Sequence, residues 1–364
     1  MDTDSIIPLP KTVQVCRKAL LDWYDGHARD LPWRVLPVAR SEGQRPDPYG
    51  VWLSEIMLQQ TSVTAVKDYY AAFLDRWPGV EHLAAAPLED VLTCWAGLGY
   101  YARARNLHAC AQRVVDQHGG VFPQTEAELR TLPGIGDYTA AAIAAIVHDL
   151  PTNVVDGNVE RVMARLHQVE RPLPDAKPEL KSLAAHYVLE YRAADWPQAL
   201  MDLGATICRP KNPKCDLCPL ERHCLATKTG KPDAYPRRRP KVARPVRYGA
   251  AFVLCRDDTV LLRRRPAKGL LGGMSEVPNS SWQAQKEVTE TVMMSAPVEA
   301  NWHNVGSVRH VFTHFALELD IYKAEASEGY QTNEGWWASC HKLDEEALPS
   351  LMRKVLAQAG MLLK

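Results

Sequence analysis

A group of cysteines is the first feature of this sequence that could do chemistry. The spacing C-x6-C-x2-C-x5-C separates Cys208, Cys215, Cys218 and Cys224, which is close enough for four thiolates to surround one compact cofactor. The other five thiols stand singly, at Cys16, Cys94, Cys110, Cys255 and Cys340. A metal site therefore fits better than a disulfide framework. Thiolate coordination also suits zinc, but we favour an iron-sulfur cluster of the 4Fe-4S type.

Basic residues stand between these cysteines, namely Arg209, Lys211, Lys214, Arg222 and His223. Positive charge on the loop 208–224 would suit contact with the phosphate backbone of a nucleic acid. The alternative is a solvated loop whose charges only offset an anionic cluster.

Two carboxyl groups have surroundings that should give them different pKa values. Glu55, in VWLSEIMLQQT, has apolar neighbours within one helical turn, and burial raises the pKa of a carboxyl group. Asp156, in NVVDGNVERV, precedes a helix whose apolar stripe starts at Val159, where free amides favour the ionised form. A protonated acid and an ionised carboxylate together can cleave a glycosidic bond. Taken singly, Glu55 could face water and Asp156 could be only a helix cap.

A tight turn between two helices is expected in PQTEAELRTLPGIGDYTAAAIAAI. Thr125 and Glu128 form a capping-box pattern, and the segment 133–136 interrupts the helical spacing. Gly134 and Gly136 would let the backbone approach a phosphate closely, where amides at the start of the second helix bind anions without reading sequence. A plain turn between helices would explain these glycines as well.

The elements that must position these residues fall into two domains. A hydrophobic fraction of 46% over 364 residues supports two packed cores. Apolar residues recur at helical spacing as far as about residue 225, as in Ile143, Ile146 and Val147. We therefore predict a mostly helical domain over 1–228 and a basic, proline-rich linker over 229–246 that leaves little to bury. Beyond it, a GAAFVLC–TVLLRRR hairpin, alternation around Leu317 and a final helix in LPSLMRKVLAQAG predict an α/β domain over 247–364.

Composition sets limits on function. The formal net charge is zero, which argues against indiscriminate binding of nucleic acid, although a local basic face is compatible with it. No basic start followed by an apolar core and no long apolar run occurs. We expect a cytoplasmic protein that makes no membrane contact.

Four motifs together resemble the helix-hairpin-helix glycosylase superfamily, and within it most closely the MutY family of adenine DNA glycosylases. They are WLSEIMLQQT, LPGIGDYTA, VDGNVERV and the four-cysteine spacing. The resemblance spans roughly residues 15–228, and the tail resembles the Nudix-like domain that MutY carries and endonuclease III lacks. It implies double-stranded DNA with adenine opposite 8-oxoguanine as the substrate, and a monomer that meets the nucleoid through DNA. Protein partners are left unknown by the resemblance.

The resemblance also assigns catalytic roles. Glu55 would protonate the adenine leaving group, Asp156 would stabilise the oxocarbenium-like sugar, and Asn158 would position Asp156. Tyr138 stands where lyase members of the superfamily carry a lysine, so the resemblance implies a monofunctional glycosylase without a Schiff-base nucleophile. Tyr138 would then be a second support for the cation, or only a packing residue.

Binding residues follow from the same resemblance. RDLPWR resembles the segment that lines the adenine pocket, which makes Arg29, Trp33 and Arg34 candidates for contacts with the flipped base. Asp202 would border this pocket. Other residues would enter the duplex near the lesion, namely Gln59, Gln60 and Tyr100. HVFTHF resembles the loop with which MutY senses 8-oxoguanine and would place three residues near that base, namely Phe312, Thr313 and His314. A simple half-buried strand would also explain HVFTHF.

The chain departs from the family pattern in three places. GLLGGMSEVP resembles the start of a Nudix box, but EVTETVMMSAPVE lacks the acidic cluster that would bind magnesium, so we expect no nucleotide hydrolysis. PVARSEGQRPDPYG is longer than the family pattern, and Asp137 is an unusual acidic residue on a phosphate-facing hairpin. Two other functions stay open: an endonuclease III-like glycosylase and lyase, and a non-catalytic lesion sensor with a cluster.

Overall fold

The computed structural model describes residues 10–240, 243–327, 329–332 and 334–362. Outside the described residues lie 1–9 of the predicted first domain, 241 and 242 of the predicted linker, and 328, 333, 363 and 364 of the predicted second domain.

The chain divides into two compact units, and the division cuts through helices instead of falling at one point in the sequence. The first unit contains Met1–Tyr70, Gly79–Glu81 and Cys110–Lys241, and the second contains Ala71–Pro78, His82–Ala109 and Val242–Lys364. The domain bounds 1–228, 229–246 and 247–364 therefore stay predictions from the sequence.

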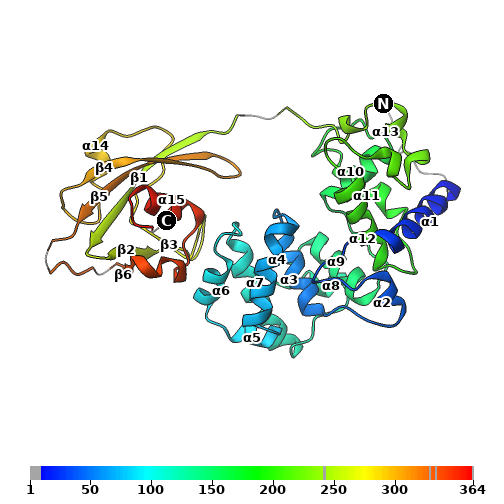
Figure 1. Cartoon of the computed structure of the whole chain (residues 1–364), viewed down its shortest axis with the longest axis horizontal. Helices are drawn as coiled ribbons and strands as arrows, with labels where there is room; N and C mark the ends of the chain where they lie inside the picture. The colour runs from blue at the N-terminus through cyan, green and yellow to red at the C-terminus, as the bar shows by residue number, and fades with distance from the viewer. Residues whose placement is uncertain (1–9, 241–242, 328, 333, 363–364) are drawn as a thin grey trace. The chain divides into compact units, whose positions relative to one another are not determined.

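Helices dominate the chain before the predicted linker, coloured from blue to green in Figure 1. Their bounds are α1 Pro10–His27, α2 Pro37–Ser41, α3 Pro48–Leu58, α4 Val63–Arg76, α5 Val80–Ala85, α6 Leu88–Trp95, α7 Ala102–His118, α8 Glu126–Leu129, α9 Asp137–His148, α10 Gly157–Leu166, α11 Lys177–Ala185, α12 Asp195–Asp202 and α13 Leu225–Lys228. A π-helical turn, Leu203–Ile207, directly follows α12. The predicted mostly helical N-terminal part is confirmed.

Local sequence rules explain where the helices around the hairpin begin and end. Thr125 caps α8 with the predicted capping box, in which its side chain and that of Glu128 satisfy each other's backbone amides. Gly134 adopts a φ of 76°, a left-handed conformation that favours glycine, and α9 then starts after Gly136. The apolar stripe of α10 is buried in a core that it shares with α1, α11 and α12.

The predicted linker differs from our expectation in its first half. Tyr235 is buried, and its backbone oxygen accepts a hydrogen bond from Arg165 Nε at 3.0 Å. The Leu173 amide donates to Arg237 O at 2.8 Å, and Arg237 forms an ion pair with Glu170. The expectation that this segment leaves little to bury is therefore wrong for its first residues. The Tyr235 side chain is buried there, and the backbone of Tyr235 and Arg237 is hydrogen-bonded to other residues of the first unit.

The second unit contains a mixed sheet of strands β1 Val246–Arg256, β2 Thr259–Arg264, β3 Ser275–Glu276, β4 His303–Val311, β5 Ala316–Glu325 and β6 Trp336–Ser339. Within the described residues the strand order is β3-β2-β1-β5-β4, with β6 paired to β2. The β1–β2 hairpin is confirmed and is antiparallel, whereas β1 and β5 run parallel. The predicted alternation places Leu317, Leu319 and Ile321 in the core.

Two helices accompany this sheet, α14 Thr289–Met293 and α15 Ser350–Gln358. In Figure 1, α15 lies against the sheet, and its residues Leu351, Met352, Val355 and Leu356 belong to the same core as β1, β2 and β5. Gly360 follows α15 with a positive φ, as the predicted glycine at the helix end requires. The predicted α/β C-terminal part is confirmed.

None of the helices in the described part of the chain combines the length and the apolarity that crossing a membrane requires.

Candidate active site

A cavity of about 770 Å³ in the first unit gathers most of the predicted site residues of that unit. Its walls come from α3, α9, α10 and α12 and from the segment 29–34. The predicted residues that line it are Arg29, Trp33, Arg34, Glu55, Gln59, Gln60, Gly134, Gly136, Tyr138, Asp156 and Asn158. The residues predicted for catalysis, for the base pocket and for the hairpin thus line the same cavity.

Glu55 lies in α3, a helix whose residues from Tyr49 to Met57 are all buried. Asp47 begins this helix by accepting hydrogen bonds from the Tyr49 and Gly50 amides. Burial raises the pKa of the Glu55 carboxyl to about 7, and the nearby charge of Asp156 adds to the rise, while the Tyr138 hydroxyl and Arg34 oppose it. Glu55 is therefore partly protonated at neutral pH, as a general acid must be.

Tyr138 links the hairpin to Glu55. It is the second residue of α9, and its hydroxyl donates a hydrogen bond of 2.9 Å to Glu55 Oε2. Burial raises the pKa of Tyr138 well above its ordinary value, so the hydroxyl keeps its proton and remains a donor near neutral pH.

Asp156 is the N-cap of α10, as predicted. Its Oδ1 accepts the amides of Asn158 and Val159 at 2.8 and 2.7 Å, and its Oδ2 accepts the Asn158 side-chain amide at 2.7 Å. Arg161 Nη2 donates to Asn158 Oδ1 at 2.7 Å and so fixes the orientation of that amide. Gly204 permits this arrangement, because a Cβ there would lie 2.6 Å from Asn158 Cβ. The hydrogen bonds recorded for the Asp156 side chain thus all come from donor groups.

Two arginines of the segment 29–34 share one buried partner. Asp202, at the end of α12, is fully buried and accepts Arg29 Nε at 2.6 Å and Arg34 Nη1 at 2.7 Å. Asp202 lies behind the cavity wall and orients both guanidinium groups. Trp33, also in the wall, contacts the Tyr70 ring edge to face, with 5.2 Å between centroids.

The hairpin and the residues that follow α3 also line the cavity. Gly136 has open space where a Cβ would point, so a ligand can approach its backbone. Asp137 pairs with Arg130 at 3.0 Å and with Lys181 at 3.8 Å, which offsets the unusual acidic charge at this position. Gln60 adopts a φ of 60° and is exposed, and Gln59 Nε2 donates to Thr139 Oγ1 at 3.2 Å.

The four predicted metal-ligand cysteines lie on the loop that follows the π-helical turn. Cys208, Cys218 and Cys224 pack against the core that contains α10. The buried Arg165 donates to Cys208 Sγ at 3.3 Å, and its backbone oxygen accepts from Cys224 at 3.4 Å. Four soft donors beside a buried guanidinium suit thiolate ligation. Among the described residues, however, no three His, Cys, Asp or Glu side chains converge closely enough to hold a metal ion.

The predicted reader residues belong to the second unit and form the tip of the β4–β5 hairpin. The Phe312 amide donates to Phe315 O at 2.9 Å and closes the turn, which leaves Thr313 and His314 exposed. Phe312 is half-buried and stacks on Trp282, with 5.8 Å between ring centroids. Tyr100, also in this unit, has its hydroxyl 3.1 Å from Thr313 Oγ1. Tyr100 and Thr313 were both predicted to lie near the lesion, and their side chains are in contact.

Sequence reasoning missed several residues of the cavity wall, namely Leu31, Ser54, Thr139, Ile146, Gln198 and Met201. Gln198 is buried and donates to Ala194 O within α12. It stands four residues before Asp202 and so lies on the same face of the helix. That spacing could have identified Gln198 once Asp202 was assigned to the pocket.

Two protein-family models match the chain. The one described as HhH-GPD superfamily base excision DNA repair protein matches residues 53–185, and the one described as NUDIX domain matches residues 249–358. Among solved structures, a thermostable thymine-DNA glycosylase has a TM-score of 0.53 at 28% identity and covers 60% of this chain and 98% of its own. An endonuclease III bound to DNA has a TM-score of 0.51 at 20% identity, covers 62% and 99%, and shows likeness of fold alone.

Several curated relatives match most of the chain, and all of them are named adenine DNA glycosylase. The adenine DNA glycosylase of Mus musculus is 33% identical over 94% of this chain and 77% of its own length. That of Homo sapiens is 34% identical over 85% and 67%, and that of Mycolicibacterium smegmatis is 38% identical over 67% and 82%. With its helix-hairpin-helix fold and the carboxylates Glu55 and Asp156 in one cavity, the chain belongs to the family of adenine DNA glycosylases, which are DNA N-glycosylases of base excision repair.

Proposed function

We propose that this protein excises adenine mispaired with 8-oxoguanine, or with guanine, in duplex DNA by acid-catalysed hydrolysis of the N-glycosidic bond. The observation that carries the proposal is the pair of carboxylates in one cavity. Burial raises the pKa of Glu55 to about 7, whereas three donor groups, two backbone amides and the side-chain amide of Asn158, surround Asp156. Glu55 can supply a proton, and the donor groups around Asp156 suit a group that faces positive charge.

The proposed reaction starts with the adenine turned out of the helix into the cavity. Glu55 donates its proton to the purine ring, the bond between the sugar C1′ and the base breaks, and the bonding electrons leave with adenine. The positive charge left on the sugar faces the carboxylate of Asp156 and the hydroxyl of Tyr138. Water then adds to C1′, its proton returns to Glu55, and an abasic site results.

The arginines of the segment 29–34 suit recognition of the extruded base. Asp202 holds both guanidinium groups, and both arginines line the cavity. Purine ring nitrogens accept hydrogen bonds from such donors, and the indole of Trp33 supplies an apolar surface. Pre-orientation of this kind lowers the entropy cost of binding the base.

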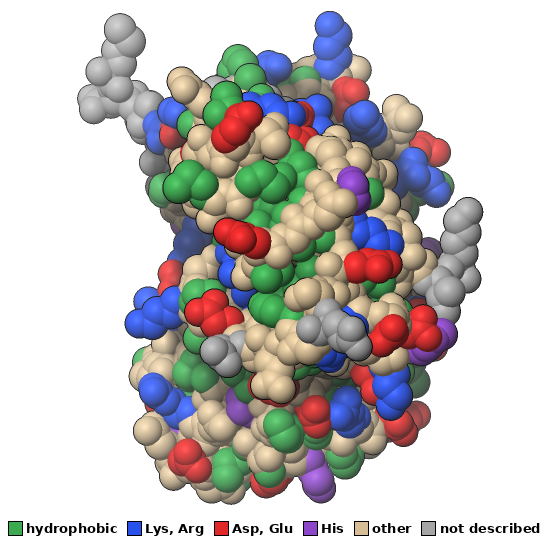
Figure 2. Space-filling model, turned by 90° about the vertical axis from the view of Figure 1, so that its left-hand side faces the viewer, with side chains coloured by type: hydrophobic (Ala, Val, Ile, Leu, Met, Phe, Trp, Pro, Cys, Tyr) green, Lys and Arg blue, Asp and Glu red, His purple; other side chains and the backbone are tan. Residues whose placement is uncertain are grey.

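Contact with the DNA backbone would fall to the hairpin. Gly134 and Gly136 bring backbone amides to the surface at the start of α9, where a phosphate is favoured by free N–H groups and by the helix dipole. This contact reads no sequence. Figure 2 shows acidic and basic side chains interspersed over the face that it draws, so such local sites, more than net charge, would govern DNA binding.

Cys208, Cys215, Cys218 and Cys224 would hold a 4Fe-4S cluster, with zinc as the less suitable alternative. When bound, the group would cross-link the loop 208–224 and so give it a fixed shape. Arg165 would then contact a thiolate, and the basic residues of the loop would be presented together. This arrangement would favour a phosphate backbone.

Tyr138 favours a glycosylase without lyase activity. A Schiff-base mechanism needs a nucleophilic amine, and at this position the cavity has a phenol that is engaged with Glu55. This argues against the endonuclease III-like alternative. The engaged pair Glu55 and Tyr138 also argues against a non-catalytic lesion sensor. We propose that the protein acts as a monomer.

The rate of adenine release should depend on pH through Glu55. Because burial raises the pKa of Glu55 to about 7, the protonated acid is present below that value and is lost above it. We expect a single-turnover rate constant that is level in mild acid and falls about tenfold per pH unit above neutrality. Measuring it from pH 5 to 9 at constant ionic strength checks this. A rate that stays constant or rises above pH 8 would contradict the role of Glu55 as the acid.

The distinction between 8-oxoguanine and guanine opposite the adenine should depend on the exposed tip of the β4–β5 hairpin. The double variant Thr313→Ala/His314→Ala should slow excision opposite 8-oxoguanine about tenfold, in line with one or two lost hydrogen bonds, and leave excision opposite guanine nearly unchanged. Ser307→Ala, at an exposed position on β4, is the matched control. Equal losses on both duplexes would show that the tip does not distinguish the two bases.

A further inference from the structure

A mostly buried arginine side chain comes from the segment before α3 that we predicted to be longer than the family pattern. Arg40 lies in α2, yet its side chain is only 9% exposed. Placing a guanidinium group in the interior is costly unless partners compensate its charge. Its partners therefore show what the segment 35–47 contributes to the fold.

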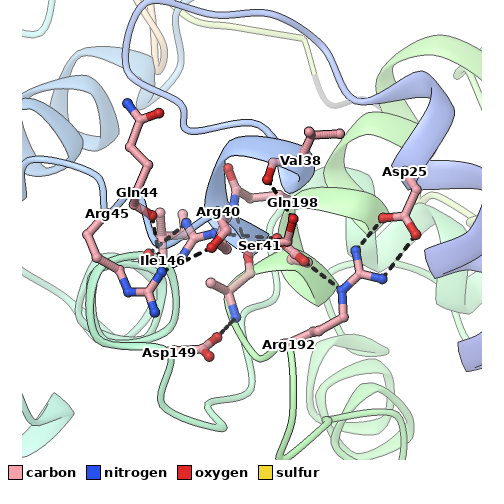
Figure 3. Close-up of polar contacts among 12 residues, drawn as sticks. Asp25, Val38, Arg40, Ser41, Gln44, Arg45, Ile146, Asp149, Arg192 and Gln198 are labelled. Atoms are coloured by element: carbon pink, nitrogen blue, oxygen red, sulfur yellow. Dashed lines mark hydrogen bonds and ion pairs between the residues drawn. The ribbon is translucent and has the colours of Figure 1, made fainter.

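Arg40 contacts two helices at once (Figure 3). Its Nη2 donates to the backbone oxygen of Ile146 in α9 at 3.1 Å, and its Nε faces Asp195 Oδ1, at the start of α12, at 3.5 Å. Asp195 also accepts Arg192 Nε at 2.7 Å, and Arg192 pairs with Asp25 of α1. Four alternating charges thus run from α2 to α1.

The pair of Arg40 and Asp195 is the weak point of this chain of charges. Neither Arg40 Nε nor Asp195 Oδ1 has a hydrogen-bond partner among the described residues, although both atoms are buried. By contrast, Asp149, which follows α9, accepts the amide of Ala194 before α12 at 2.6 Å. At this end one direct hydrogen bond joins the segments after α9 and before α12. Arg40 links the two helices indirectly, through a hydrogen bond to α9 and a long ion pair to α12.

These two helices form part of the wall of the active-site cavity. α9 begins with Tyr138, which is bonded to Glu55, and Ile146 near its end lines the same cavity. α12 contributes Gln198 and Met201, within two turns of Asp195. A shift of α12 against α9 would therefore move the groups that surround the base.

We propose that Arg40 is a positioning residue for the reaction: it holds α12 against α9 and so sets the shape of the wall that receives the flipped adenine. This inference rests on the proposed function. Arg40 acts through Gln198 and Met201 and does not line the cavity. The segment 35–47, which includes most of the loop 37–48 that we predicted to be longer than the family pattern, thereby supports the base pocket from behind.

A second cavity, of about 530 Å³, lies beside the contact between Arg40 and Asp195. It is lined by Asp25, Pro37, Val38, Arg40, Ser41, Arg45, Asp149, Arg192 and Asp195. A small cation from solution can therefore reach the place that a truncated Arg40 would leave. This opening makes chemical rescue of an Arg40 variant possible.

The test compares Arg40→Ala with Arg45→Ala by single-turnover excision of adenine. Arg45 belongs to the same segment and is exposed, and within the described part of the chain its side chain donates to the backbone oxygens of Arg40 and Gln44. Small displacements near reacting groups cost up to about 100-fold in rate, so we expect a 10- to 100-fold loss for Arg40→Ala and none for Arg45→Ala. Millimolar guanidinium should restore most of the rate of Arg40→Ala only, at a temperature where circular dichroism shows all variants folded.

Two further measurements distinguish positioning from plain stability. Arg40→Ala combined with Gln198→Ala should lose less than the product of the single losses, because both act on one wall. A duplex with fluorescent 2-aminopurine in place of adenine should show altered emission with Arg40→Ala, whether or not the bond is cleaved. A wild-type rate for Arg40→Ala, multiplicative losses, or a deficit that guanidinium leaves unchanged would overturn the inference. An inactive wild-type protein would instead contradict the proposed function. The 2-aminopurine emission would then test the role of Arg40, because that signal does not require cleavage of the bond.

Discussion

Replacing Glu55 by glutamine is expected to lower the single-turnover rate of adenine release by about 10²- to 10⁴-fold, the usual contribution of a positioned general acid. Glutamine fills nearly the same volume and can still accept the hydrogen bond from Tyr138, but it has no acidic proton to donate. The buried site should therefore keep its shape. The measurement is quenched single-turnover cleavage with protein in excess over DNA.

A matched control separates proton donation from loss of charge in the cavity. Glu160 lines the same cavity and pairs with Lys177 at 3.0 Å, so Glu160→Gln removes a carboxylate there without touching the proposed acid. We expect Glu160→Gln to stay within a few-fold of the wild-type rate. If Glu55→Gln retained a rate like that of Glu160→Gln, another group would have to protonate the base.

The second large effect should come from Asp156→Asn. Asparagine is as good an N-cap as aspartate, so α10 should keep its start while the sugar cation loses the facing negative charge. Removing one preorganised electrostatic partner of a transition state typically costs about 10²- to 10³-fold. We expect a loss of that size in the rate of bond cleavage, measured under the same single-turnover conditions.

Asp47→Asn is the control for this variant. Asp47 caps α3 by accepting two backbone amides, as Asp156 does for α10, but Asp47 is not among the residues that line the cavity. The same change of side chain there should leave the rate nearly unaltered. Equal losses for the two variants would assign the effect to helix capping and not to stabilisation of the cation.

Local patterns predicted the environments of the proposed catalytic residues, because neighbours in the sequence create those environments. Glu55 stands in a run so apolar that α3 is buried all round. Asp156 precedes an apolar stripe and therefore becomes a cap. The cysteines were found by spacing alone. In each case neighbours within one or two helical turns carry the information.

Long-range partners could not be predicted in this way. Asp202 orients two guanidinium groups about 170 positions earlier in the chain, and no local pattern indicates that pairing. Arg40 stands in a polar segment typical of an exposed loop, yet its partners are Ile146 and Asp195. Tyr235 was assigned to a linker because prolines and basic residues surround it, but it is buried. These roles depend on which distant helices meet.

The measurement that tests the central claim most directly is excision from a duplex with adenine opposite 8-oxoguanine, beside an adenine–thymine duplex. The protein carries its metal cofactor, and Glu55→Gln is assayed in parallel. We predict strand breaks at the adenine of the lesion duplex only after alkali treatment, with free adenine released and with both lost in Glu55→Gln. Breaks without alkali would indicate a lyase. No release of adenine by folded, cluster-containing protein would contradict the account and favour a lesion sensor.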